Sequence, residues 1–128
     1  MVAGAAVKYQ IDGKHDLKDQ QEILMNIADM LIELFVCESV LLRIQKLASR
    51  SSVEDMTHHS AILSILMHDA QSRISKSATD ALISFATGDE LKIMLMGIKR
   101  FTRYPAVNVV ALRRKIADKA IQANNYNY

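Results

Sequence analysis

The sequence predicts an all-α protein, an up-and-down bundle of about four helices. Glycine occurs four times and proline once in 128 residues, and neither interrupts the chain between positions 14 and 87. That stretch consists mostly of Leu, Ile, Ala, Met, Glu, Lys and Gln, a composition that favours helices. Its apolar residues recur at spacings of three and four, as on one side of a helix. Long helices are therefore expected.

One globular domain, residues 1–128, is the expected organisation. Half of the residues are apolar and 23% are charged, which excludes a disordered or collagen-like chain. Cys37 is the only cysteine, so no internal disulfide can form, and a reducing, cytoplasmic compartment is expected. No stretch reaches 18 uncharged apolar residues, so no transmembrane helix is predicted.

The first residues, MVAGAAVKY, predict a short helical segment. They lack the basic region and the length of a signal peptide. We interpret them as the last turns of a helix whose beginning lies outside this chain. The loop IDGKHD, residues 11–16, follows, with Gly13 at its bend and Asp16 as the expected N-cap of the next helix.

The second helix, predicted from Leu17 to about Ser49, is expected to be the central one. One side carries apolar residues at helical spacing: Leu24, Ile27, Ala28, Leu31, Phe35 and Leu42. Further apolar residues broaden this side: Ile23, Met30, Cys37, Leu41 and Ile44. Only a narrow strip stays polar, so we expect neighbours on more than one side of this helix. Something beyond the bundle, such as a second copy of the chain, is expected to cover part of it.

A third helix is predicted after the break SRSSVED, residues 49–55, where Ser52 and Asp55 resemble a capping box. It runs to about Ala86 along an apolar seam of Leu63, Leu66, Met67, Ala70, Ile74, Ala81 and Phe85. Because the connection is short, the two long helices are expected to form an antiparallel hairpin about 45 Å long.

Two shorter helices complete the predicted bundle. Gly88 suits the C′ position of the third helix, and Asp89 suits the N-cap of the fourth. The fourth helix must end near Tyr104, because Pro105 cannot continue it. Asn108 is the expected N-cap of the last helix, VALRRKIADKAIQA, which frays into NNYNY.

Positive charge is concentrated towards the C-terminal end. Residues 1–91 hold eight Lys or Arg against thirteen Asp or Glu, whereas residues 92–128 hold eight against one. On the fourth helix an apolar side is formed by Leu91, Met94, Leu95, Ile98 and Phe101. The other side carries a candidate surface for an anionic partner: Lys92, Lys99, Arg100 and Arg103. A solvated bundle face, a surface for anionic lipid or acyl-CoA phosphates, and a contact with a protein or a second copy all stay open.

Other motifs argue against several classes of function. The last helix carries four more basic residues, Arg113, Arg114, Lys115 and Lys119, but no nucleic-acid-binding motif accompanies them, so no nucleic-acid partner is expected. His58 and His59 diverge by about 100° on a helix, and His68 lies about 15 Å further along, so no metal site is expected. GxGxxG, P-loop and GxSxG motifs are absent, so no cofactor-binding or catalytic residue is predicted in this chain.

Glu38 lies among the apolar residues of the central helix, where an unpaired carboxylate is costly. The expected explanation is a buried structural ion pair with Arg73 on the facing helix. Unchanged thermal stability in both Glu38→Gln and Arg73→Met would contradict this pair. The alternative, a catalytic base, requires a solvent-reachable pocket beside Glu38.

The segments QQEILMNIADMLIELFVCESVLLRIQKLAS and MHDAQSRISKSATDAL resemble the C-terminal helical extension of the very-long-chain type of acyl-CoA dehydrogenase. That extension has an ADxxIDLY helix, an aliphatic run followed by Arg, and an AAxRI-like element. Their counterparts here are Ala28, Asp29, Ile32, Glu33, Leu34 and Phe35, the run to Leu42 with Arg43, and Ala70, Arg73 and Ile74. The end, GDELKIMLMGIKRFTRYPAVNVVALRRKIADKAIQANNY, is similar to bacterial members, particularly those of the Bacteroidetes type. The similarity covers about residues 17–128.

The resemblance implies that the chain is the C-terminal part of a longer, FAD-dependent acyl-CoA dehydrogenase of fatty-acid β-oxidation. In that family the FAD site, the acyl-CoA site and the catalytic glutamate lie in the preceding core, so this chain alone is expected to be no enzyme. The resemblance also implies packing on the dehydrogenase core, homo-oligomer organisation and peripheral membrane contact. A free-standing helical adaptor, whose basic surface binds an anionic lipid or a protein, is the alternative.

Overall fold

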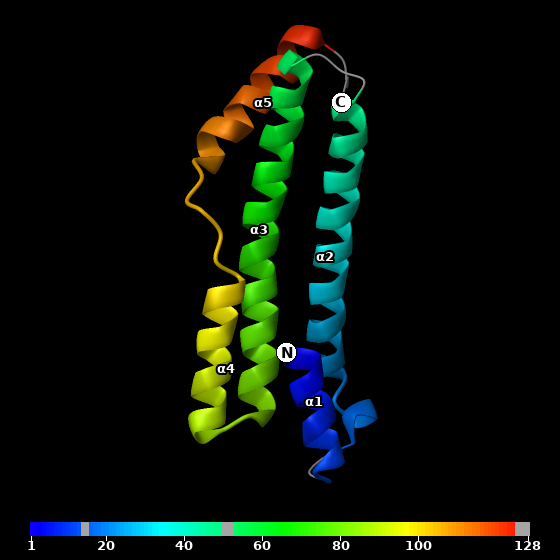
Figure 1. The fold of residues 1–128 in the computed structure, drawn as a ribbon, viewed down its shortest axis with the longest axis vertical. Coiled ribbons are helices and arrows are strands. Elements are labelled where there is room, and N and C mark those ends of the chain that lie inside the picture. The colour runs from blue at the N-terminus through cyan, green and yellow to red at the C-terminus, as the bar shows by residue number, and fades with distance from the viewer. Residues whose placement is uncertain (14–15, 50–52, 125–128) are drawn as a thin grey trace. The chain divides into compact units, whose positions relative to one another are not determined.

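The computed structural model describes residues 1–13, 16–49 and 53–124, and these residues are mostly helical (Figure 1). The α-helices within them are α1 (Val2–Ile11), α2 (Gln21–Ala48), α3 (Val53–Phe85), α4 (Gly88–Phe101) and α5 (Val109–Ala123). A 3-10 turn, η1 (Leu17–Asp19), precedes α2. The described residues contain no strand, so the all-α prediction is confirmed, including its two long helices, two shorter C-terminal helices and short N-terminal helix.

The chain divides into two compact units. Unit 1 consists of Met1–Leu34 and Gln71–Arg103, and unit 2 consists of Phe35–Ala70 and Tyr104–Tyr128. The boundaries after Leu34 and after Ala70 fall inside long helices, so each unit contains part of α2 and part of α3, and the boundary after Arg103 lies between α4 and α5. The expectation of one domain over residues 1–128 stays a prediction.

An alanine-rich core holds unit 1 together. Its buried members come from α1, α2, α3 and α4: Val2, Ala6, Ile23, Ala78, Ala81, Leu82 and Ile98. Because alanine side chains are short, helix backbones can approach closely at these positions. Leu82, the largest fully buried side chain, has no exposed surface (0%). The contacts also set the relative direction of α2 and α3. Ile23, near the start of α2, shares the core with Leu82 near the end of α3, whereas Glu33, later in α2, bonds to Arg73, earlier in α3. Within unit 1, α2 and α3 are therefore antiparallel.

Helix α4 packs with most of its predicted apolar side on this core. Leu91, Met94 and Leu95 lie against it and Ile98 belongs to it. Phe101 departs from the prediction, since 77% of its surface is exposed. It is the last residue of α4 and lies just beyond the core contact of Ile98. The apolar pattern of α4 therefore extends past the part of the helix that the core covers.

Burial on α2 differs from the predicted seam. The predicted residues Leu24, Ala28, Leu31, Phe35 and Leu42 are exposed. The residues thought only to broaden the seam include the buried ones, Ile23, Cys37 and Ile44. The physical reason is that apolar residues surround most of this helix, so its periodicity does not tell which side the remaining helices cover. The correction leaves a set of large apolar side chains on α2 in contact with solvent.

Several predicted helix ends also need correction. Asp16 accepts a hydrogen bond from the Lys18 amide (3.2 Å) at the start of η1, and α2 begins only at Gln21. At the start of α4, Thr87 is the N-cap and Asp89 lies in the first turn.

Gly88 begins α4 instead of following α3 as its C′ residue, and its φ of +63° explains why glycine suits this sharp turn. Helix α4 ends at Phe101, before the predicted limit near Tyr104. The capping box predicted at Ser52 lies outside the described residues.

Unit 2 has a smaller buried set from α2 and α3: Cys37, Ile44, Ala61 and Ala70. Helix α5 is tied to α3 by Arg113, which donates to both carboxylate oxygens of Asp69 at 3.1 and 2.8 Å. The predicted cap of α5 is confirmed, because the Asn108 side chain accepts a hydrogen bond from the Ala111 amide at 3.0 Å.

Replacing Asn108 by alanine is expected to lower the free energy of unfolding by about 1 kcal/mol, because the Ala111 amide loses its bond partner. Thr87→Ala is the matched control, since Thr87 caps α4 without a side-chain hydrogen bond. The free energy of unfolding of Thr87→Ala should stay within about 0.5 kcal/mol of that of the natural chain. Urea unfolding followed by circular dichroism measures both, and equal losses in the two variants would contradict the assigned cap.

Candidate functional site

A groove in unit 1 is the largest apolar recess among the described cavities, with a volume of about 480 Å³. Its walls come from four helices and from Met1 and Thr102 at their ends: Met1, Val2, Ala3, Ile27, Met30, Leu31, Leu34, Ile74, Ala78, Ile98, Phe101 and Thr102. We call this recess the unit 1 groove. Thr102 supplies its only polar side chain, and that hydroxyl donates to the Ile98 carbonyl at 2.8 Å. The lining of the groove therefore favours contact with apolar groups.

The candidate anionic contact residues are all exposed at the surface. Lys92 lies near the start of α4 and donates to Asp89 at 3.0 Å, so a carboxylate already accompanies its charge. Lys99, Arg100 and Arg103 lie at the other end of α4, close in sequence to Thr102 of the unit 1 groove. Within the described residues, no carboxylate forms an ion pair with these three side chains. Whether they contact an anionic partner stays a prediction.

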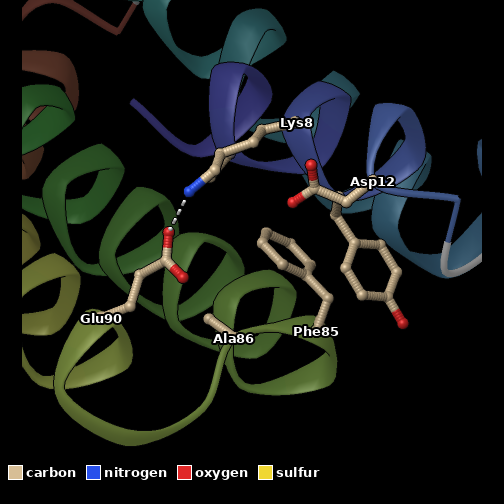
Figure 2. Close-up of a pocket in the computed structure, with 7 residues that line it drawn as sticks. Lys8, Asp12, Phe85, Ala86 and Glu90 are labelled. Atoms are coloured by element: carbon tan, nitrogen blue, oxygen red, sulfur yellow. Dashed lines mark hydrogen bonds and ion pairs between the residues drawn. The ribbon is translucent and has the colours of Figure 1, made fainter.

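A second, much smaller cavity of about 30 Å³ lies between α1, the end of α3 and the start of α4 (Figure 2). Figure 2 shows Lys8 reaching across to Glu90, with an Nζ–Oε1 distance of 3.1 Å. The hydrogen bond and the charge of Glu90 raise the pKa of Lys8. Beside this pair, the rings of Tyr9 and Phe85 lie 5.4 Å apart. The volume of this cavity is close to that of a single water molecule, so it has no room for a substrate. The bond between Lys8 and Glu90 joins α1 to α4 at this place.

The predicted buried pair of Glu38 and Arg73 needs correction. Glu38 is exposed, and the partner that the structure gives Arg73 is Glu33, with Nη2 at 2.8 Å from Oε2 and Nε bonded to the other oxygen. The hydrogen bond from Arg73 lowers the pKa of Glu33. Glu33 and Glu38 are about 140° apart on a helix, so the two carboxylates lie on different sides of α2 and only one of them can face Arg73. Glu38 also lines none of the three cavities described here.

The pair lines a cavity of about 340 Å³ in unit 1 together with Asp29, Ile32, Lys76 and Ser77. Positive and negative side chains are mixed in this cavity, so it has no strong preference for an anion or a cation. Lys76 is in addition bonded to Asp80, one helical turn further along α3.

The histidines provide no metal centre in the described part of the chain. No group of three or more His, Cys, Asp or Glu side chains is arranged to hold a metal ion there. His68 Nδ1 lies 3.4 Å from Asp69, the residue that also binds Arg113. Burial is the largest influence on Asp69 and favours a higher pKa, but the hydrogen bonds from His68 and Arg113 and their charges together lower it. The cluster connects α3 to α5 and is structural in character.

Comparison with known proteins decides the family. Residues 1–100 match the family model described as "Acyl-CoA dehydrogenase, C-terminal domain". The chain belongs to this family. A probable acyl-CoA dehydrogenase of Bacillus subtilis (strain 168) is 30% identical over 107 residues, which are 84% of this chain and 18% of that protein. The resemblance to the acyl-CoA dehydrogenase C-terminal domain is thereby confirmed, whereas the Bacteroidetes-type lineage stays a prediction.

A crystal structure of a relative is similar to this chain. The acyl-CoA dehydrogenase from Bacillus anthracis, complexed with FAD, matches all of this chain (100%) with a TM-score of 0.89 and 33% identity. The match takes up 22% of that protein's chain. This acyl-CoA dehydrogenase C-terminal domain therefore spans about a fifth of the length of these relatives.

The unit 1 groove does not fit the FAD of that relative. A flavin dinucleotide carries a diphosphate, which proteins hold with clustered amides or cationic side chains. Among the groove's lining residues only Thr102 has a polar side chain, and its hydroxyl hydrogen is given to Ile98. No part of the dehydrogenation chemistry is therefore assigned to this groove. In the described residues, no helix is both long and apolar enough to cross a membrane.

Glu33→Gln should lower the free energy of unfolding by about 0.5–1 kcal/mol at neutral pH, since it replaces a charged bidentate pair. Because the folded-state pKa of Glu33 is lowered, the pair stabilises fully above the ordinary value of 4.5 and is lost as pH falls through the lowered value. Thermal unfolding from pH 7 to pH 3 should show the variant and the natural chain converging in acid. Glu38→Gln, an exposed carboxylate on the same helix, is the control and should leave stability unchanged. A larger loss of unfolding free energy in Glu38→Gln than in Glu33→Gln would instead support the predicted pair of Glu38 and Arg73.

Proposed function

We propose that this chain acts as a non-catalytic C-terminal helical domain of an FAD-dependent acyl-CoA dehydrogenase. The family membership supports this proposal, as does the share of the Bacillus relatives that the chain matches. In this proposal, FAD and the oxidation of the acyl-CoA belong to the dehydrogenase core. The residues of this chain contribute to packing and assembly.

The apolar surface of α2 is the observation that carries the packing role. Within unit 1 its exposed large side chains include Leu24, Met25 and Ile32, and within unit 2 they include Phe35 and Leu42. Phe35 has 70% of its surface exposed. Isolated exposed apolar residues are ordinary, but a set of this kind along one helix is typical of a surface that another protein covers. We propose the dehydrogenase core, or a second copy of the assembled enzyme, as that cover.

A second candidate role is contact with an anionic surface through Lys99, Arg100 and Arg103. The exposure of these residues and the scarcity of acidic residues in 92–128 support it. Sedimentation with anionic and neutral vesicles at two salt concentrations distinguishes this role, because electrostatic binding weakens as salt rises. Equal amounts of protein sedimenting with anionic and with neutral vesicles would contradict this role.

A chimaera tests the packing proposal directly. The region of the Bacillus anthracis enzyme that matches this chain is replaced by this chain, and FAD retention and thermal unfolding are measured. The chimaera should retain FAD. Phe35→Asp should destabilise it by about 2 kcal/mol or more, because a carboxylate would then be buried against apolar surface.

Ile121→Asp is the matched control, since Ile121 is similarly exposed (75%) but lies on α5. It should leave the chimaera's stability close to that of the parent chimaera. Phe35→Asp in the separate 128-residue chain should also be tolerated, because that side chain already faces solvent. A parent chimaera as stable as its Phe35→Asp variant would contradict docking through α2.

A further inference from the structure

Helix α5 differs from the other helices in the burial of its side chains. None of its residues from Val109 to Ala123 is buried, whereas α1, α2, α3 and α4 all contribute buried residues. Val109, Leu112 and Ile116 are half-buried and recur at spacings of three and four, so they form one apolar stripe along α5. A helix with few buried apolar contacts opens locally at a lower free energy than the core of the same protein.

An ion pair joins this side of α5 to α3. Arg113 lies within about 100° of the whole stripe on a helical wheel. Its Nη2 donates to both carboxylate oxygens of Asp69 on α3, at 3.1 and 2.8 Å. The Arg113 side chain is 55% exposed and that of Asp69 is 32% exposed, so dissolved ions can approach both charges. The attraction between them therefore weakens as the salt concentration rises.

The backbone around α5 permits movement of the helix as one piece. Residues 103–108, which join α4 to α5, have no helical backbone. The N-cap bond from the Ala111 amide to the Asn108 side chain lies at the start of α5 itself. The Val109 amide donates to the Val107 carbonyl at 2.9 Å, a contact that is also local. Helix α5 can therefore leave α3 with its cap and its own backbone bonds intact.

We propose that α5 is a detachable arm, which the ion pair of Asp69 and Arg113 latches onto α3 and which rising ionic strength releases. Release exposes the apolar stripe of Val109, Leu112 and Ile116 to solvent. The latch gives the chain a conformational response to salt, in addition to its proposed structural role. It uses no residue of the α2 surface, so it does not depend on the proposed packing on a dehydrogenase core.

Hydrogen exchange of the 128-residue chain, followed by mass spectrometry at low and at high salt, tests the proposal. At low salt the amides of α5 should exchange at least about tenfold faster than those of α3 around Leu82, because Leu82 lies in the buried core. High salt should accelerate exchange in α5 about threefold and leave the amides around Leu82 unchanged. One common exchange rate for both helices, or an α5 rate independent of salt, would overturn the proposal.

Variants of the two latch residues identify the cause of the salt response. Asp69→Asn and Arg113→Gln should each accelerate exchange in α5 about fivefold at low salt, because either change removes the charged pair. Both variants should also lose most of the response to salt, and combining them should add little. Arg114→Gln, which removes the next charge along α5, is the matched control and should behave like the natural chain. Equal effects of Arg113→Gln and Arg114→Gln would contradict the latch.

Thiol labelling gives a second readout of the same opening. A cysteine introduced by Leu112→Cys lies in the half-buried stripe, and one introduced by Ala111→Cys lies on the exposed side of α5. Labelling of the first should become about threefold faster at high salt, whereas labelling of the second should be fast at both concentrations. The natural chain, whose Cys37 is buried, gives the background rate. An identical salt response at both positions would contradict detachment of α5.

Discussion

Close packing at alanine positions is the constraint on which unit 1 depends. Ala6, Ala78 and Ala81 are buried beside Leu82, where α1, α2, α3 and α4 all contribute to one core. A larger side chain at these positions would force neighbouring helices apart, because protein interiors leave little free volume. The unit 1 groove depends on the same arrangement, since Val2, Ala78 and Ile98 belong both to the core and to the groove lining.

The chain carries more apolar surface than its own helices cover. This surplus is concentrated on α2, where residues on one side are buried and many on the others face solvent. The proposed packing on a dehydrogenase core would explain the surplus, because a domain that packs within a larger protein needs an apolar contact surface. Some charged pairs, by contrast, join helices within a unit, as Lys8 and Glu90 do in unit 1 and Asp69 and Arg113 do in unit 2.

The sequence was sufficient for the helices and for the family, but not for the side of each helix that is buried. Long runs without proline or glycine determine that α2 and α3 form, and Asn108 has a cap geometry that depends only on nearby residues. The choice of Glu33 over Glu38 as the partner of Arg73 depends on how α2 and α3 are rotated against each other, which no local pattern records. The groove likewise brings together residues from four separate helices, so no local sequence motif could predict it.

Two of the groove's lining side chains are methionines, Met1 and Met30. A methionine side chain is unbranched and turns about three bonds, and its polarisable sulfur makes favourable contacts in many orientations. These two side chains can change their contour at little energetic cost, whereas the valine and the three isoleucines of the same lining are β-branched and stiffer. The recess is therefore adaptable at its two methionine positions and more rigid where isoleucine and valine form the wall.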